Sequence, residues 1–202
     1  MKKPQWVIFD VGNVLYDFLG FAKDMAKLYG VTQDAMLKAV NDATPGTMDG
    51  EVTDYNWWKT VLIILKLEDK MEEIWKHWQE DLNYWLSDTK KLMSELDIAG
   101  YKIAILTNNW ENQTEDLKKN LSKYANIQFY FESSVLKMSK PSEKLYRYVE
   151  KTIKASGDEI FFIDDIQKYL EGTKKLGWQT FLYSRGDDEG KSSNDLIRKQ
   201  LL

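Results

Sequence analysis

The sequence predicts an α/β fold, in which a doubly wound parallel sheet is interrupted by an inserted bundle of α-helices. Short apolar runs, which favour strands buried on both faces, alternate with helical segments through the second half of the chain. This alternation is typical of a doubly wound sheet. Between the first apolar run and the next lies a long stretch with helical spacing and no strand pattern. We therefore expect a core domain of residues 1–16 and 88–202 and a helical domain of residues 17–87.

The first expected strand is Trp6 to Phe9, an apolar run that ends at Asp10. Four helices are expected to follow, each with apolar residues at helical spacing. Asp69 precedes Glu72 with the spacing of a capping box at the start of the fourth. In order, we expect a helix over 18–29 ended by Gly30, a helix over 32–40, a loop at 44–46, a turn at 49–53, a helix with Trp58, Leu62 and Leu65 on one stripe, and a helix with Met71, Ile74, Trp75, Trp78, Leu82 and Trp85 on its apolar face.

The alternation of helix and strand resumes from Asp88. Leu92 and Leu96 mark a helix that ends at Gly100, because glycine readily adopts the backbone conformation that terminates a helix. The further elements expected are a strand over 101–106, a helix that begins at 112–115, a strand over 128–131, a helix over 142–155, a strand that starts at 160, a short helix to 176, a strand over 178–183 and a terminal helix over 194–202.

The composition excludes several kinds of site and partner. With 28 basic and 32 acidic residues among 202, the net charge is −4. The sequence has no basic patch of the kind that binds nucleic acid, so we expect no nucleic-acid partner. The chain has no cysteine, which excludes disulfides, thiolate metal sites and a cysteine nucleophile. No segment approaches the about 18 apolar residues of a membrane span, and the first apolar run is too short for a signal peptide. We expect a cytoplasmic protein without a membrane partner, as a monomer or a homodimer.

Polar side chains follow the apolar runs where three expected strands end. Asp10 follows the first, Thr107 and Asn108 end the second, and Asp164 and Asp165 end the third. Right-handed crossovers bring the carboxyl ends of parallel strands to one edge of the sheet. The three carboxylates would crowd there, and such a cluster needs a proton or a cation. Because these ligands are hard oxygens, Mg²⁺ is the expected ion.

Lys140 lies just before an expected helix start at Pro141 and Ser142. Its positive charge and that of Mg²⁺ together offset the three carboxylates and leave room for an anionic substrate. The sequence therefore indicates a phosphate site.

Asp10, Thr107, Lys140 and the Asp164-Asp165 pair, in this order and context, resemble the four motifs of the haloacid dehalogenase-like hydrolase superfamily. The resemblance covers nearly the whole chain and implies a Rossmann-like core with the inserted helices as its cap. It is nearest to a sugar-phosphatase-like branch, close to the N-terminal phosphatase domain of soluble epoxide hydrolase. It implies a phosphoric monoester hydrolase for a small-molecule phosphate ester, such as a sugar phosphate.

The resemblance also implies a role for each acidic residue. Asp10 would be the nucleophile and form an aspartyl-phosphate that water later hydrolyses. The other oxygen of Asp10, the carbonyl of Gly12 and the carboxylate of Asp165 would hold Mg²⁺, and Asp164 would act through a bound water. Thr107 and the backbone amide of Asn108 would bind the phosphoryl oxygens, while Lys140 would neutralise charge on the transferring group.

Two positions depart from the family pattern. Most of its phosphatases carry an aspartate, the general acid and base, where this chain has Gly12, and losing a general acid commonly costs about 10²–10⁴ in rate. Tyr169 stands where the fourth motif often continues to asparagine. Two alternative functions follow from Gly12. One is a 2-haloacid dehalogenase, since a halide leaves without a proton, although that branch lacks the Asp-Asp metal pair. The other is a catalytically weak phosphate- or partner-binding protein.

Overall fold

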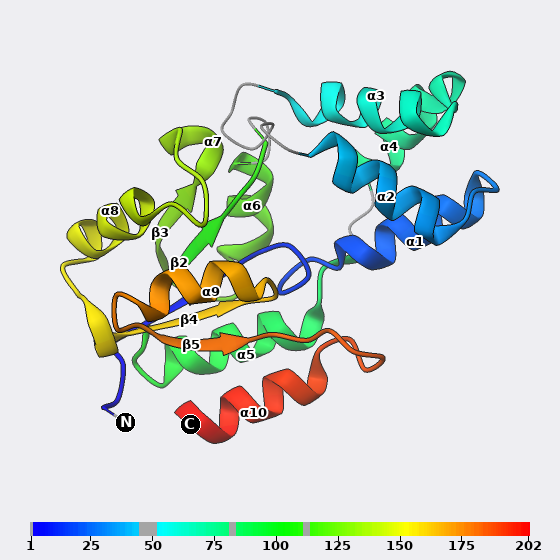
Figure 1. Ribbon diagram of the computed structural model, residues 1–202. Coiled ribbons are helices and arrows are strands. Elements are labelled where there is room, and N and C mark those ends of the chain that lie inside the picture. Colours follow the sequence, from blue (N-terminus) through cyan, green and yellow to red (C-terminus); the bar gives the residue numbers. More distant parts are fainter. Residues whose placement is uncertain (1, 45–51, 81–83, 111–113) are drawn as a thin grey trace.

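The computed structural model describes residues 2–44, 52–80, 84–110 and 114–202 (Figure 1). Within these ranges, five parallel strands form one sheet in the order β3-β2-β1-β4-β5. The predicted doubly wound α/β fold is confirmed. The strands are β1 (Trp6–Phe9), β2 (Lys102–Thr107), β3 (Ile127–Glu132), β4 (Ile160–Asp164) and β5 (Gln179–Leu182).

Helices cover both faces of the sheet. One face, with Val7 and Phe9 of β1, packs against α5 (Ser87–Ile98), α6 (Thr114–Leu121) and α10 (Lys191–Leu201). The other face, with Trp6 and Ile8, packs against α8 (Glu143–Ile153) and α9 (Gln167–Lys174). Alternate residues of β1 point to opposite faces, and all four are buried, which is why the strand appears in the sequence as an uninterrupted apolar run. Two short elements complete the core: α7 (Ser133–Leu136) and the 3₁₀ turn η4 (Gly157–Glu159).

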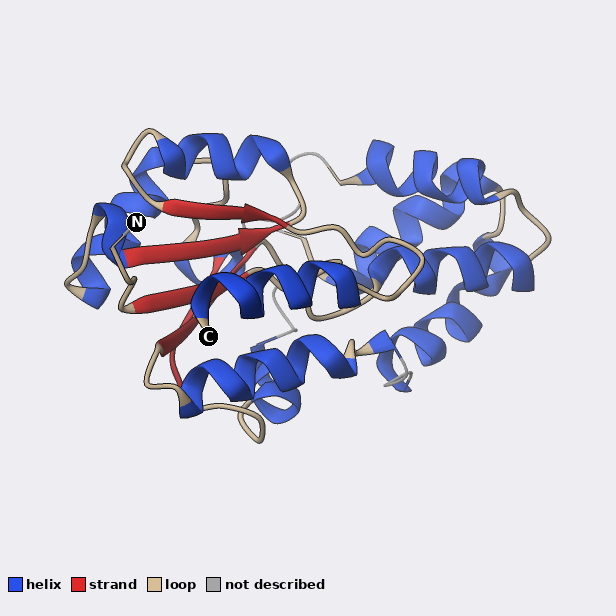
Figure 2. Cartoon of the chain, turned by 90° about the horizontal axis from the view of Figure 1, so that it is seen from below, coloured by secondary structure: helices blue, strands red, loops and turns tan. Residues whose placement is uncertain are grey.

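The helices between β1 and α5 form a separate layer beyond the carboxyl ends of the strands (Figure 2). We call them the cap helices: α1 (Phe18–Leu28), α2 (Gln33–Ala43), α3 (Asp54–Leu65) and α4 (Met71–Glu80), with the 3₁₀ turn η1 (Glu68–Lys70) before α4. Their shared core is aromatic, and Trp57 and Trp58 are almost fully buried in it. Most of the loop at 44–46 and the turn at 49–53, as well as the start of the helix expected from 112, lie outside the described residues.

Two details of the fourth cap helix were predicted wrongly. The apolar pattern was extended to Trp85, but Trp85 lies in an isolated bridge with Tyr16 rather than in α4. Asp69 was expected to cap the helix, but it lies inside η1.

The chain passes between the sheet and the cap helices along two paired connections. Tyr16 and Trp85 face each other in an antiparallel bridge, and the Asp17 amide donates to the carbonyl of Tyr84 at 2.7 Å. The Asp17 carboxylate caps α1 through the Gly20 amide at 2.8 Å and forms an ion pair with Arg185 at 2.7 Å. Since Arg185 follows β5, this pair ties the start of the cap helices to the core.

No helix in the described parts of the chain has the length and apolar character needed to span a membrane.

Candidate active site

The candidate site lies at the carboxyl edge of the sheet, under the cap helices. Asp10 directly follows β1, and its amide donates to the carbonyl of Ile163 in β4 at 2.9 Å. Thr107 ends β2 and Asp164 ends β4, the two neighbours of β1. The register therefore brings motifs that are far apart in the sequence to one place.

Lys140 connects two carboxylates of this edge. Its Nζ lies 2.8 Å from Asp10 Oδ1 and 2.7 Å from Asp164 Oδ2, and all three side chains are buried. Burial alone would lower the pKa of Lys140, but the charges of Asp10 and Asp164 raise it above its ordinary value. Lys140 is thus a fixed positive charge at neutral pH, shared between the two carboxylates.

The acidic cluster consists of Asp10, Asp164 and Asp165, each of which offers an oxygen within 4.8 Å of the others. Burial raises the pKa of Asp164 to about 7 and that of Asp165 to about 6, with Asp10 adding repulsion in both cases. A cation would remove this electrostatic cost, because it favours the ionised form of each group.

The donor set fits a small hard cation. Lys140 and the Ile166 amide, the latter at 2.8 Å, occupy both oxygens of Asp164, so this residue is poorly placed to be a direct ligand. Asp10 Oδ2 lies outside the ion pair with Lys140, and Asp165 Oδ1 lies outside the hydrogen bond from Asn13. Two carboxylate oxygens with no soft atom beside them suit Mg²⁺.

Gly12 lies in the tight loop after Asp10. The Tyr16 amide donates to the carbonyl of Val11 at 2.9 Å, and the Asn13 amide donates to the carbonyl of Tyr16 at 2.6 Å. A Cβ atom built on Gly12 would meet nothing within 4 Å. Steric crowding therefore does not explain the glycine, and a side chain at this position would have room.

The side chain of Asn108, next to Thr107 of the second motif, binds the backbone of Lys140, a contact that the sequence did not predict. The side-chain amide of Asn108 accepts from the Lys140 amide at 2.8 Å and donates to the Lys140 carbonyl at 3.1 Å. The ring of Tyr169 lies beneath the Lys140 ammonium, with its centroid 4.9 Å from Nζ. Cation–π contact and a paired backbone hydrogen bond both restrict the lysine.

Asn109 fixes the same loop from the other side. Its side chain donates to Glu132 at 2.8 Å and accepts from the Ser134 hydroxyl at 2.9 Å. Thr107, the predicted phosphate ligand, is buried beside this loop. The loop after β2 is therefore held rigidly against the end of β3.

Trp110 extends from this loop into the cap helices. Its ring centroid is 4.4 Å from that of Trp57 and 6.3 Å from that of Trp78. Its side chain is buried in the aromatic core of the cap helices. Its main contact is thus with the cap layer.

All the predicted site residues lie on this edge: Asp10, Gly12, Thr107, Asn108, Lys140, Asp164 and Asp165. Three contributors were missed, namely the side-chain amide of Asn108, the ring of Tyr169 and the side chain of Asn13, which donates to Asp165. Their contacts come from segments distant in the sequence. Only Asn13 gave a signal, as an asparagine in a tight turn directly after Gly12.

The chain is similar to known proteins in sequence and in fold. A family model described as haloacid dehalogenase-like hydrolase matches residues 7–183. Among curated proteins, the bifunctional epoxide hydrolase 2 of Sus scrofa is 28% identical over 107 residues, which cover 51% of this chain. The match covers 19% of that relative, so the chain spans about a fifth of its length.

Solved structures show the same fold at low identity. A haloacid dehalogenase-family enzyme of Bacteroides thetaiotaomicron, in complex with magnesium and inorganic phosphate, has a TM-score of 0.63 at 16% identity, covering 92% of this chain and 96% of that one. The L-2-haloacid dehalogenase of Xanthobacter autotrophicus, with chloropropionic acid covalently bound, has a TM-score of 0.69 at 17% identity, covering 98% and 84%.

Proposed function

Because the chain belongs to the haloacid dehalogenase-like hydrolase family, we propose that it is a Mg²⁺-dependent phosphatase that acts on a small phosphorylated metabolite, such as a sugar phosphate, in the cytoplasm. The observation that carries the proposal is the cluster of Asp10, Asp164 and Asp165, of which the first two are buried and bound to Lys140. Three carboxylates with one lysine leave an unbalanced negative charge. A divalent cation would neutralise it and make room for a phosphate dianion.

Asp10 is the proposed nucleophile. One oxygen of its carboxylate would bond to phosphorus as the P–O bond to the leaving group breaks, and the other would stay available for Mg²⁺. Water then attacks phosphorus, releases inorganic phosphate and regenerates the Asp10 carboxylate. Lys140 also neutralises charge on the transferring group, and its fixed position means that little reorganisation is needed during the reaction.

The phosphoryl oxygens are assigned to Thr107 and to the backbone amide of Asn108, in the loop that Asn109 anchors. Such preorganised donors are expected to bind the transferring group more strongly than the intact substrate.

Asp10, Asp165 and the carbonyl of Gly12 would hold Mg²⁺, and Asp164 would contribute through a water. When bound, the ion supplies positive charge that stabilises the negative charge of the phosphoryl group. The Bacteroides thetaiotaomicron enzyme has the same fold and was solved in complex with magnesium and inorganic phosphate, which supports this assignment.

Gly12 favours substrates with good leaving groups. Without an acid at position 12, the departing oxygen must take its proton from water or from the substrate itself. Aryl phosphates, acyl phosphates and anomeric sugar phosphates release weakly basic oxygens, so they depend least on a general acid.

The absence of an acid at Gly12 also fits a dehalogenase, because a halide leaves without a proton. The covalently bound chloropropionic acid of the Xanthobacter autotrophicus enzyme shows that this fold hosts such chemistry. The Asp164-Asp165 pair argues against it here, since a carboxylate cluster of this kind serves a cation.

Turnover assays with a phosphate ester, with 2-chloropropionate and with a panel of phosphorylated metabolites separate these functions. We expect release of phosphate from p-nitrophenyl phosphate with Mg²⁺, its loss in excess EDTA and its return with added Mg²⁺. Release of chloride from 2-chloropropionate in EDTA would instead favour the dehalogenase. Absence of turnover on a panel of phosphorylated metabolites, despite phosphate binding, would favour the binding protein.

A further inference from the structure

Asn13 occupies an unusual backbone position beside the acidic cluster. Its φ is 53°, in the left-handed region, where asparagine is better tolerated than most side chains. Three consecutive amides, those of Val14, Leu15 and Tyr16, donate to the carbonyl of Val11 and hold the loop closed. The side chain of Asn13 therefore starts from a fixed position.

Both ends of this side chain are engaged. Nδ2 donates to Asp165 Oδ2 at 3.1 Å, and Oδ1 accepts from the Leu19 amide at 3.0 Å. Leu19 lies in the first turn of α1, the first of the cap helices. One amide group thus connects a carboxylate of the cluster to the start of the cap helices.

The three carboxylates differ in what holds them. Lys140 binds Asp10 and Asp164, and Asp164 also accepts from the Ile166 amide. Asp165 lies outside this lysine-centred arrangement and is less buried than the other two. The side-chain hydrogen bond that orients it comes from Asn13.

We propose that Asn13 is a positioning residue, which holds Asp165 in the orientation needed to share Mg²⁺ with Asp10 and ties that carboxylate to the first turn of α1. The inference rests on the proposed function in one respect, because it takes Asp165 as a ligand of Mg²⁺. Hydrogen-bond partners of metal ligands typically contribute about 10–100-fold to metal affinity. Loss of the Asn13 side chain should weaken Mg²⁺ binding by that factor.

The test is calorimetric titration of Mg²⁺ into the metal-free full chain, with Asn13→Gly as the variant. Glycine adopts a positive φ readily, so this change removes the side chain and leaves the loop conformation accessible. Lys154→Gly is the matched control. Lys154 has a φ of 54°, is exposed, and lies at the end of α8, before the amino end of β4. Both substitutions therefore relieve the same backbone conformation, and one lies far from the cluster.

We expect the Mg²⁺ dissociation constant to rise about 10–100-fold in Asn13→Gly and to stay unchanged in Lys154→Gly. The rise in melting temperature that Mg²⁺ produces should shrink in Asn13→Gly alone, since that rise depends on affinity. A purely structural role would lower the melting temperature without altering the affinity of the folded protein.

Equal affinity in Asn13→Gly and the wild type would overturn the inference and leave the proposed phosphatase untouched. Absence of Mg²⁺ binding to the wild type would also overturn it. Weakened binding in Asn13→Gly would support it even if the wild type hydrolysed no phosphate ester, because the readout is binding rather than turnover.

Discussion

The ammonium of Lys140 lies 2.8 Å from the carboxylate of Asp10, although 130 positions separate the two residues in the chain. The same ammonium binds Asp164, so one buried cation holds two buried anions. Removing it would leave two carboxylates unpaired. Breaking a buried ion pair in this way typically costs about 3–5 kcal/mol.

We therefore expect Lys140→Met to lower the free energy of unfolding by about 3 kcal/mol or more in metal-free buffer. Adding Asp164→Asn to that variant should restore part of the loss, because one uncompensated charge disappears. Urea denaturation of the wild type, the single variant and the double variant measures both effects. A double variant less stable than Lys140→Met would contradict this account of the cluster.

The open space at Gly12 allows a general acid to be introduced at this position by substitution. Gly12→Asp should fold normally, since a side chain at this position meets nothing within 4 Å of its Cβ. The gain should be greatest for primary alkyl phosphates, by about 10²-fold or more, and small for aryl phosphates. The dependence of rate on leaving-group pKa should flatten.

Gly12→Asn is the control for this comparison, because it has the same size and carries no acid. Steady-state rates across substituted phenyl phosphates and alkyl phosphates give the slope for each protein. A flat dependence in the wild type would mean that another residue supplies the proton.

Trp110 follows strand β2 of the core in the sequence, but its side chain packs in the aromatic cluster of the cap helices. Trp110→Ala should lower the free energy of unfolding by about 3–5 kcal/mol, which is the usual cost of truncating a buried aromatic residue. It should also weaken the packing of the cap helices against the core. Limited proteolysis should then cut faster near the paired connections at 16–18 and 84–86. Trp75→Ala is a suitable comparison, because Trp75 packs on Tyr55 within the cap layer, with ring centroids 5.0 Å apart. Equal cleavage rates in the two variants would argue against a bridging role for Trp110.

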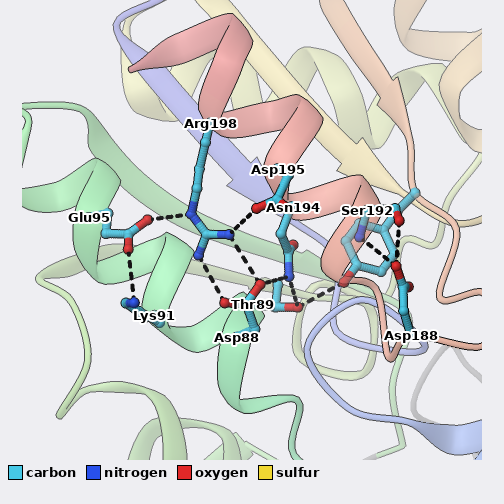
Figure 3. A network of polar contacts seen from close by, with 10 residues as sticks. Asp88, Thr89, Lys91, Glu95, Asp188, Ser192, Asn194, Asp195 and Arg198 are labelled. Atoms are coloured by element: carbon cyan, nitrogen blue, oxygen red, sulfur yellow. Dashed lines mark hydrogen bonds and ion pairs between the residues drawn. The ribbon is translucent and has the colours of Figure 1, made fainter.

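The last helix is fastened to α5 by a polar network centred on Arg198 (Figure 3). Arg198 binds both oxygens of Asp88 at 3.1 Å and Glu95 at 2.6 Å. Its hydrogen bonds hold the pKa of Asp88 below the ordinary value of 3.8. A carboxylate with a lowered pKa stabilises the fold above its unfolded pKa, and this stabilisation is lost as pH falls through its folded pKa.

Arg198→Ala should therefore lower the melting temperature at pH 7 by about 2–4 °C, which corresponds to about 1 kcal/mol for a partly exposed pair in a chain of this length. The difference from the wild type should narrow as pH falls below about 4, because Asp88 protonates first in the unfolded chain, and it should be smallest below the lowered folded pKa. Melting curves at pH 7 and pH 3 provide the measurement. A difference that stays constant across this range would show that packing of the arginine, rather than its charge, fastens the helix.

The sequence was sufficient for the fold because each buried strand carries its own signal. Trp6 to Phe9 and Ile160 to Ile163 are apolar on both faces, as strands covered by helices must be. The ends of the helices were harder to predict. Trp85 continues the apolar pattern of α4, and its ring packs on Tyr16, which Trp78 of α4 also contacts, but its backbone forms a bridge with Tyr16.

Some features of the candidate site could also be predicted from the sequence, and others could not. Asp10 and Asp164 could be predicted because each directly ends a strand, and parallel strands share one carboxyl edge. The pairing of the Asn108 side chain with the Lys140 backbone could not be predicted, because it depends on how two loops meet. The same holds for the ring of Tyr169 beneath Lys140, which depends on how α9 packs.

Covalent trapping tests the central proposal most directly. An aspartyl-phosphate on Asp10 can be reduced with borohydride during turnover of p-nitrophenyl phosphate with Mg²⁺, which converts the modified residue to homoserine. Mass spectrometry of the peptide that contains position 10 should then show homoserine in the wild type and no such product in Asp10→Asn, which should also lack turnover. Unmodified Asp10 in a protein that hydrolyses the substrate, or clear phosphatase activity in Asp10→Asn, would contradict the account.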